Sequence, residues 1–301
     1  MGSLELEFCG VKFKNPVVAA SGTFHYGREY SELFPLALLG GVTTKGTSLL
    51  PRAGAPGPRV TETPAGMLNA IGLENPGLTA ALPELEWLQA QGTRVIFNAY
   101  GESPAEFAEL ARRSQPYCDL FELNLSCPNV AAGHLPFASD PAAAAAAVRA
   151  AKDATDRPVI AKLSPEGPVL AVAQSCQAAG ADGFSLINTL RGMQIDSTTQ
   201  KPRLGNLSGG LSGPAIRPLA VYWLYQLARQ TDLPLIGMGG VQNWEDGLEL
   251  ALAGAHLVAI GSASFHDPYA APKLAQGLAD FFQDRPDSWR DWVGRAVAKS
   301  S

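Results

Sequence analysis

Polar residues that could bind a ligand follow each of eight short apolar runs in this sequence. One such residue would usually be a turn or capping residue, but turns alone do not explain a polar position after every run. We therefore predict one site that is assembled from the ends of several strands. Its first candidates are Ser21, Lys45, Asn98, Asn124, Lys162, Asn188, Gly239-Gly240 and Gly261-Ser262.

The asparagines among these candidates indicate what kind of ligand the site would hold. An amide donates and accepts hydrogen bonds at once, and it is costly to bury without partners. Asn98, Asn124 and Asn188 therefore favour a flat heterocycle with alternating C=O and N–H groups, such as a pyrimidine or an isoalloxazine. A lone asparagine at a strand end would more often be a turn or cap residue.

Two lysines would add positive charge to the same site, and two glycine segments would add backbone N–H groups that can bind a phosphate. Lys45 and Lys162 could meet a phosphate, a carboxylate or the electron-rich edge of a reduced flavin; the alternative is a lysine that extends to solvent at the rim. Gly239-Gly240 and Gly261-Ser262 follow the last two runs, where β/α barrels commonly bind phosphate through backbone N–H groups. Tight turns are the alternative for these glycines.

Cys127 lies in the segment Asn124–Asn129 and is the cysteine best placed for chemistry, as a nucleophile or a general base. The neighbouring Pro128 and polar residues argue against its burial in a core. We interpret Cys9, Cys118 and Cys176 as small buried hydrophobic residues. Since the chain has no CxxC pair, we expect no disulfide framework, metal site or iron–sulfur site of its own.

The eight apolar runs are short and rich in β-forming residues, and helical patterns follow most of them. Near-continuous apolar runs of this length suit parallel strands that are buried on both faces. Their alternation with helices predicts a (β/α)8 TIM barrel. A doubly wound sheet is the alternative, but no GxGxxG follows the first run. The runs are 16–20, 41–44, 94–98, 120–125, 159–163, 183–188, 235–238 and 257–260.

Several further features belong to this predicted architecture. Ser103, Asp140 and Asn243 are expected to cap helices. Residues 4–8 and 11–13 alternate like a β-hairpin, which could plug the amino-terminal mouth of the barrel. The connections 46–93 and 189–234 are long insertions at the C-terminal face, and we interpret them as covers of the active site or partner surfaces rather than surface decoration. Residues 1–301 are interpreted as a single domain.

Composition excludes some classes of protein. Among the 301 residues, 46% are hydrophobic and 17% are charged, which excludes a disordered chain. A net charge of −5 disfavours a nucleic-acid partner. We expect a cytoplasmic protein with no membrane contact, because no signal peptide is visible and the longest apolar stretch, 250–265, is short and interrupted.

Six motifs in order along the chain resemble the class 1 dihydroorotate dehydrogenases, flavin enzymes of pyrimidine biosynthesis, and the resemblance extends from Phe8 to Pro268. Each motif alone is weak, but their order is specific. The motifs are 15–24, 44–47, 124–129, 187–190, 209–215 and 237–240.

The segments 66–77 and 192–196 are closer to class 1B, the catalytic subunit of the NAD-linked enzyme. That resemblance implies a partner subunit carrying FAD and a [2Fe–2S] cluster, with two copies of each chain in a heterotetramer. The alternatives are a class 1A-like homodimer linked to fumarate, or another FMN barrel such as dihydropyrimidine dehydrogenase or a tRNA dihydrouridine oxidoreductase. A flavin-binding scaffold subunit without activity is a third possibility.

The resemblance also implies a role for each site residue. Cys127 would be the catalytic base that removes the C5 proton of dihydroorotate, while hydride passes from C6 to N5 of one FMN per chain. The substrate would be held by Lys45, Asn69, Ala70, Ile71, Gly72, Leu73, Asn124, Asn188 and Thr189. FMN would be held by Ser21, Lys45, Gly46, Asn98, Asn124, Lys162, Ile187, Gly213, Gly239, Gly240, Gly261 and Ser262.

Two segments depart from the pattern of the family. Residues 131–134 read Ala-Ala-Gly-His where the family usually has a Gly-Gly pair, in the loop that carries Cys127. Glu166 stands where the family usually has asparagine. We expect Glu166 to lie outside the site.

Overall fold

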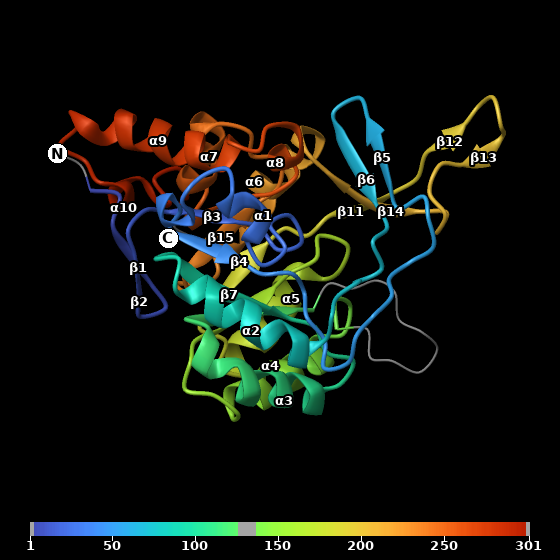
Figure 1. Ribbon diagram of the computed structural model, residues 1–301. Helices are drawn as coiled ribbons and strands as arrows, with labels where there is room; N and C mark the ends of the chain where they lie inside the picture. Colours follow the sequence, from blue (N-terminus) through green and yellow to red (C-terminus); the bar gives the residue numbers. More distant parts are fainter. Residues whose placement is uncertain (1–2, 126–136, 299–301) are drawn as a thin grey trace.

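A closed barrel of eight parallel strands forms the centre of the computed structural model, which describes residues 3–125 and 137–298 (Figure 1). Each strand pairs with its neighbours in chain order, and the barrel closes where β16 pairs with β3, with Val258 opposite Val17. The predicted (β/α)8 architecture is confirmed. The strands are β3 (Val17–Ala19), β4 (Gly41–Thr43), β7 (Arg94–Ala99), β8 (Leu120–Asn124), β9 (Val159–Lys162), β10 (Gly183–Leu186), β15 (Leu235–Met238) and β16 (Ala255–Ile260).

Helices surround the barrel and explain why its strands are apolar along most of their length. The predicted caps are present: Ser103 accepts a hydrogen bond from the N–H of Glu106, Asp140 from that of Ala142, and Asn243 from that of Asp246. No helix in the described part of the chain is long and apolar enough to cross a membrane. The longer helices are α2 (Leu78–Gln89), α3 (Pro104–Ser114), α4 (Pro141–Lys152), α5 (Val169–Ala178), α6 (Arg217–Ala228), α7 (Trp244–Leu252) and α9 (Ala270–Gln283).

Six short helices complete the chain. They are α1 (Arg28–Ser31), α8 (Ala263–His266) and α10 (Trp289–Trp292), with the 3₁₀ turns η1 (Leu36–Leu38), η2 (Gln115–Tyr117) and η3 (Pro214–Ile216).

The predicted hairpin is formed by β1 (Leu6–Phe8) and β2 (Val11–Phe13), which pair in antiparallel fashion. Phe8 and Phe13 are fully buried, with an edge-to-face contact at 6.2 Å between ring centroids. A Cβ added at Gly41, the first residue of β4, would lie 3.1 Å from the Phe13 ring. The hairpin therefore packs against the amino-terminal ends of the barrel strands.

The two long connections meet in one antiparallel sheet, which we call the insertion sheet. It has the order β11-β14-β6-β5 and lies across the barrel from the hairpin (Figure 1). Its strands are β5 (Val60–Thr63), β6 (Gly66–Asn69), β11 (Leu190–Gly192) and β14 (Gly209–Ser212). A ribbon of β12 (Ile195–Asp196) and β13 (Lys201–Pro202) extends beyond it. The sequence predicted insertions here but not their pairing.

Truncation of the hairpin ring at Phe13 tests its contribution to the fold. We expect Phe13→Ala to lower the free energy of unfolding by about 3–5 kcal/mol, because the substitution leaves a cavity at the closed end of the barrel. Lys12→Ala, on the exposed face of the same strand, should change stability by less than about 0.5 kcal/mol. Chemical denaturation measures both values, and equal losses would contradict the packing described here.

Candidate active site

One cavity of about 600 Å³ opens at the carboxyl-terminal ends of the barrel strands. Residues at or just after the ends of all eight strands line it, and the insertion sheet contributes further residues. Parallel strands place their carboxyl ends at one face of the barrel, which is where barrel enzymes build their sites.

The structure brings the predicted residues together in this cavity, with one exception. Cys127 lies outside the described residues. The others that line the cavity are Ser21, Lys45, Gly46, Asn69, Ala70, Ile71, Gly72, Leu73, Asn98, Asn124, Lys162, Ile187, Asn188, Thr189, Gly213, Gly239, Gly240, Gly261 and Ser262.

A buried polar group lies on the barrel side of the cavity. The Lys162 ammonium donates a hydrogen bond to Ser21 Oγ at 3.1 Å and lies 3.8 Å from Oε1 of Glu122. The same carboxylate oxygen accepts a hydrogen bond from Asn98 Nδ2 at 2.6 Å. Lys162 is 4% exposed and Glu122 is completely buried. These side chains are thus held by the barrel itself rather than by the insertions.

One unsatisfied acceptor on a lining residue and glycine backbone without side chains fit FMN in this cavity. Asn98 Oδ1 is buried and has no hydrogen-bond partner among the described residues, and such an acceptor beside a cavity suits an N–H donor of a flavin ring. Gly239 and Gly240 have φ values of +127° and +76°, which residues with a Cβ rarely adopt. Because they have no side chains, their backbone N–H groups after β15 are accessible to a phosphate.

Lys45 adds a second cation to the cavity. Burial lowers the pKa of its ammonium, Glu74 opposes this effect and Arg59 adds to it. A cation that has lost solvent gains more from an anionic partner than an exposed one does. Lys45 is therefore suited to hold the carboxylate of a substrate or an anionic edge of a cofactor.

Two of the segments predicted to bind substrate are held in place by the insertions. Asn69, at the end of β6, donates a hydrogen bond to the carbonyl of Gly210 at 3.3 Å. Asn188 Oδ1 accepts one from the N–H of Thr189 at 2.8 Å. A Cβ at Gly210 would lie 2.0 Å from Thr189 Oγ1, so this position of β14 requires glycine. The pairing of β14 with β6 and β11 thus places both predicted substrate segments.

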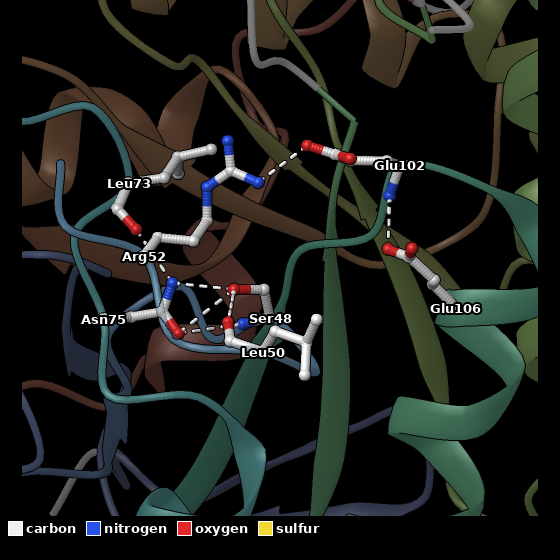
Figure 2. A network of polar contacts seen from close by, with 7 residues as sticks. All are labelled: Ser48, Leu50, Arg52, Leu73, Asn75, Glu102 and Glu106. Carbon is white, nitrogen blue, oxygen red and sulfur yellow. Dashed lines mark hydrogen bonds and ion pairs between the residues drawn. The ribbon is translucent and has the colours of Figure 1, made fainter. Parts of the chain in front are cut away.

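Asn75 anchors the end of the segment Asn69–Leu73 (Figure 2). Its Nδ2 donates to the carbonyl of Leu73 at 2.8 Å and to Ser48 Oγ at 2.9 Å. Its Oδ1 accepts from the N–H of Ser48 at 3.1 Å and from that of Gly77 at 3.0 Å. The amide therefore joins the segment to the chain that follows β4.

A second part of this network connects the same chain to the loop after β7. Arg52 donates to Glu102 Oε1 at 2.6 Å, and the N–H of Glu102 donates to Glu106 Oε2 at 2.9 Å (Figure 2). The backbones of Arg52 and Asn75 also exchange two hydrogen bonds, at 2.9 and 3.1 Å. The segment Asn69–Leu73 is thereby fixed to two barrel loops.

Glu166 corrects one expectation, because it lines the cavity instead of lying outside the site. Its Oε1 accepts a hydrogen bond from the N–H of Arg191 at 2.5 Å, and its other oxygen lies 3.9 Å from the Arg191 guanidinium. The expectation was wrong because β11 brings Arg191 back to the loop after β9.

Several other lining residues had no assignment from the sequence. About half of them lie within the segments 15–24, 66–77, 209–215 and 237–240, which could have identified them, whereas no motif covers the others. The lining residues without an assignment are Ala20, Gly22, Thr23, Val60, Met67, Arg191, Asn206, Ser208, Gly209, Gly210, Ser212, Ile216, Met238, Val241, Ala259 and Phe265.

The cysteines in the described part of the chain lie away from the cavity. Cys118 and Cys176 are buried, and Cys9 is partly buried with its thiol donating to the carbonyl of Asp182. Burial raises the pKa of all three thiols, that of Cys176 to about 12. They remain protonated at neutral pH. No group of three or more His, Cys, Asp or Glu among the described residues could hold a metal ion.

Removal of the Asn75 amide tests its role as an anchor. We expect Asn75→Ala to weaken orotate binding about three- to tenfold, because the carbonyl of Leu73 loses its fixed donor. FMN affinity should change less than about twofold. Asn243→Ala, which removes a helix cap elsewhere, is the matched control. Equal effects of both variants in calorimetric titrations with orotate would contradict this role.

Comparison with known proteins agrees with this geometry. The family model for dihydroorotate dehydrogenase matches residues 3–282. Three relatives are named dihydroorotate dehydrogenase B (NAD(+)), catalytic subunit. The protein from Bacillus pumilus (strain SAFR-032) is 47% identical over 91% of this chain and 90% of its own length. Those from Pelobacter propionicus and Anoxybacillus flavithermus are 47% and 48% identical, over 93% and 92% of this chain and 94% and 90% of their own lengths. The chain therefore belongs to the dihydroorotate dehydrogenase family.

Proposed function

We propose that this chain is the FMN-binding catalytic subunit of an NAD-linked dihydroorotate dehydrogenase, which oxidises (S)-dihydroorotate to orotate in pyrimidine biosynthesis. The observation that supports this function best is the composition of the cavity at the barrel's carboxyl end. It combines two lysines, five asparagines and glycine segments that fit FMN on one side and a small anionic heterocycle on the other. The names of the relatives support the same activity.

Lys45 and the asparagines would bind and orient the substrate. The lysine offers a cation to the dihydroorotate carboxylate, and the desolvation that lowers its pKa strengthens this attraction. Asn69, Asn124 and Asn188 offer amides to the C=O and N–H groups of the ring. Held this way, the ring presents one face to the flavin and the opposite face to the base.

Cys127 would be the base that removes the proton from C5. This position is α to a carbonyl, so the negative charge that develops there is delocalised onto oxygen. Asn124 lines the cavity, and Cys127 follows it by three residues in the motif 124–129. A thiol has an ordinary pKa of about 8.5, so the rate should increase with pH toward that value.

When bound, FMN would supply the acceptor for the hydride of C6 at its N5. The residues of this chain hold the flavin so that the reacting atoms meet. Asn98 and Lys162 would contact the ring, whereas Gly239-Gly240 and Gly261-Ser262 would bind the phosphate. FMN would be bound once per chain.

A second, different subunit would carry the electrons onward to NAD. The sequence has no GxGxxG after a strand and no CxxC pair. We propose that the partner carries FAD and a [2Fe–2S] cluster, with two copies of each chain in the assembly. Exposed apolar side chains on the insertion sheet, on its ribbon and in the loops between them would suit this contact. They are Val60, Met193, Ile195 and Leu207.

Anaerobic mixing with dihydroorotate tests the activity and the base together. The wild-type chain should bleach its flavin absorbance, and Cys127→Ala should slow this step at least about a hundredfold while FMN stays bound. Cys127→Ser should retain a little activity that increases with pH. Cys176→Ala, at a buried site away from the cavity, should react like the wild type. If wild-type flavin is not reduced, the proposed activity is wrong.

Steady-state assays of the isolated chain test the partner. We expect turnover with an artificial dye but little turnover with NAD, because the chain lacks the groups that would pass electrons out of the barrel. Adding the partner subunit should restore NAD reduction. Fast turnover with fumarate would instead show a class 1A-like homodimer, and NAD turnover without a partner would refute the two-subunit proposal.

A further inference from the structure

Glu122 is a completely buried carboxylate in the middle of a barrel strand. It lies on β8, where every residue is buried, and the other side chains before Asn124 are Leu120, Phe121 and Leu123. Removing a carboxylate from water costs several kcal/mol or more unless it is paired. A glutamate in this place therefore calls for a specific physical reason.

The partners of Glu122 are two side chains of the cavity. Oε1 accepts a hydrogen bond from Asn98 Nδ2 at 2.6 Å and lies 3.8 Å from Lys162 Nζ. Oε2 has no hydrogen-bond partner among the described residues. Glu122 itself does not line the cavity, whereas Asn98 and Lys162 do. The carboxylate thus stands directly behind two groups that fit the flavin.

Stability alone does not account for this arrangement. Buried ion pairs commonly add little to stability compared with apolar residues of the same size. Here the pairing is also incomplete, since one carboxylate oxygen lacks a hydrogen bond within the described chain. What the carboxylate does provide is a fixed orientation for Asn98 and a negative charge beside the Lys162 cation.

We propose that Glu122 is a positioning residue that orients Lys162 and Asn98 toward the flavin and moderates the reduction potential of bound FMN. This inference rests on the FMN binding of the proposed function. Two-electron reduction makes the pyrimidine edge of a flavin electron-rich, and a nearby cation stabilises that form. The negative charge of Glu122 offsets part of the Lys162 field, which acts strongly in a buried, poorly screened place.

The Glu122→Gln variant removes the negative charge of this side chain while nearly keeping its size and shape. Glutamine retains an oxygen that can accept from Asn98 but removes the negative charge. We expect reduced FMN to bind at least about tenfold more tightly relative to oxidised FMN, which raises the two-electron potential by about 30 mV. Equilibration with reference dyes under anaerobic conditions measures the potential. A structural role alone would change thermal stability without this shift.

Asp182→Asn is the matched control. Asp182 pairs with Lys152 at 2.8 Å and precedes β10 at the opposite, amino-terminal end of the barrel. The substitution changes net charge by the same amount as Glu122→Gln, but at a site far from the cavity. It should therefore shift the ratio of the affinities for reduced and oxidised FMN by less than about twofold. Lys162→Gln should shift the potential in the opposite direction, because it removes the cation itself.

The possible results separate this inference from the proposed function. A wild-type chain that binds no FMN would refute the proposed function. A wild-type chain that binds FMN, with an unchanged potential in Glu122→Gln or an equal shift in Asp182→Asn, would overturn the role of Glu122 alone. If Glu122→Gln does not fold, Glu122→Asp keeps the charge but shortens its reach. Its FMN affinity should fall, and unchanged affinity would also overturn the inference.

Discussion

Closure of the barrel is the constraint on which the rest of this structure depends. Each of the eight strands pairs with two parallel neighbours, so the backbone hydrogen bonds of the barrel are used within it. Both faces of each strand are covered, which requires apolar residues along most of its length. Chemistry is then left to the strand ends and the connections, where side chains reach a common cavity.

Much of this follows from the sequence because the signals are local. Apolar runs predicted the eight strands, and Ser103, Asp140 and Asn243 predicted the starts of helices, because capping depends on neighbouring residues. The strand-end candidates meet in one cavity for the same reason: once the barrel is recognised, parallel strands determine where their carboxyl ends lie.

The remainder depends on contacts between distant parts of the chain. The insertion sheet joins residues 60–69 to residues 190–212. Its strand β14 begins with a glycine pair and therefore lacks the alternation of apolar and polar residues from which a strand is predicted. The contact of Glu166 with Arg191 depends on that sheet, so its place in the cavity could not be expected. The role of Glu122 could not be predicted from its apolar run for a related reason, because its partners Asn98 and Lys162 lie on β7 and β9.

The cavity has two sides, one formed by the barrel strands and one by the insertions. The barrel side consists of buried, mutually bonded groups such as Lys162 and Asn98, whose positions depend on the closed sheet. The insertion side presents Asn69 through Leu73 and is held by hydrogen bonds such as those of Asn75. In the function proposed above, changes in the insertions would act mainly on substrate recognition, whereas Glu122 and Lys162 would act on the flavin. Lys45 and Asn124, which the resemblance assigns to both ligands, would connect the two sides of the site.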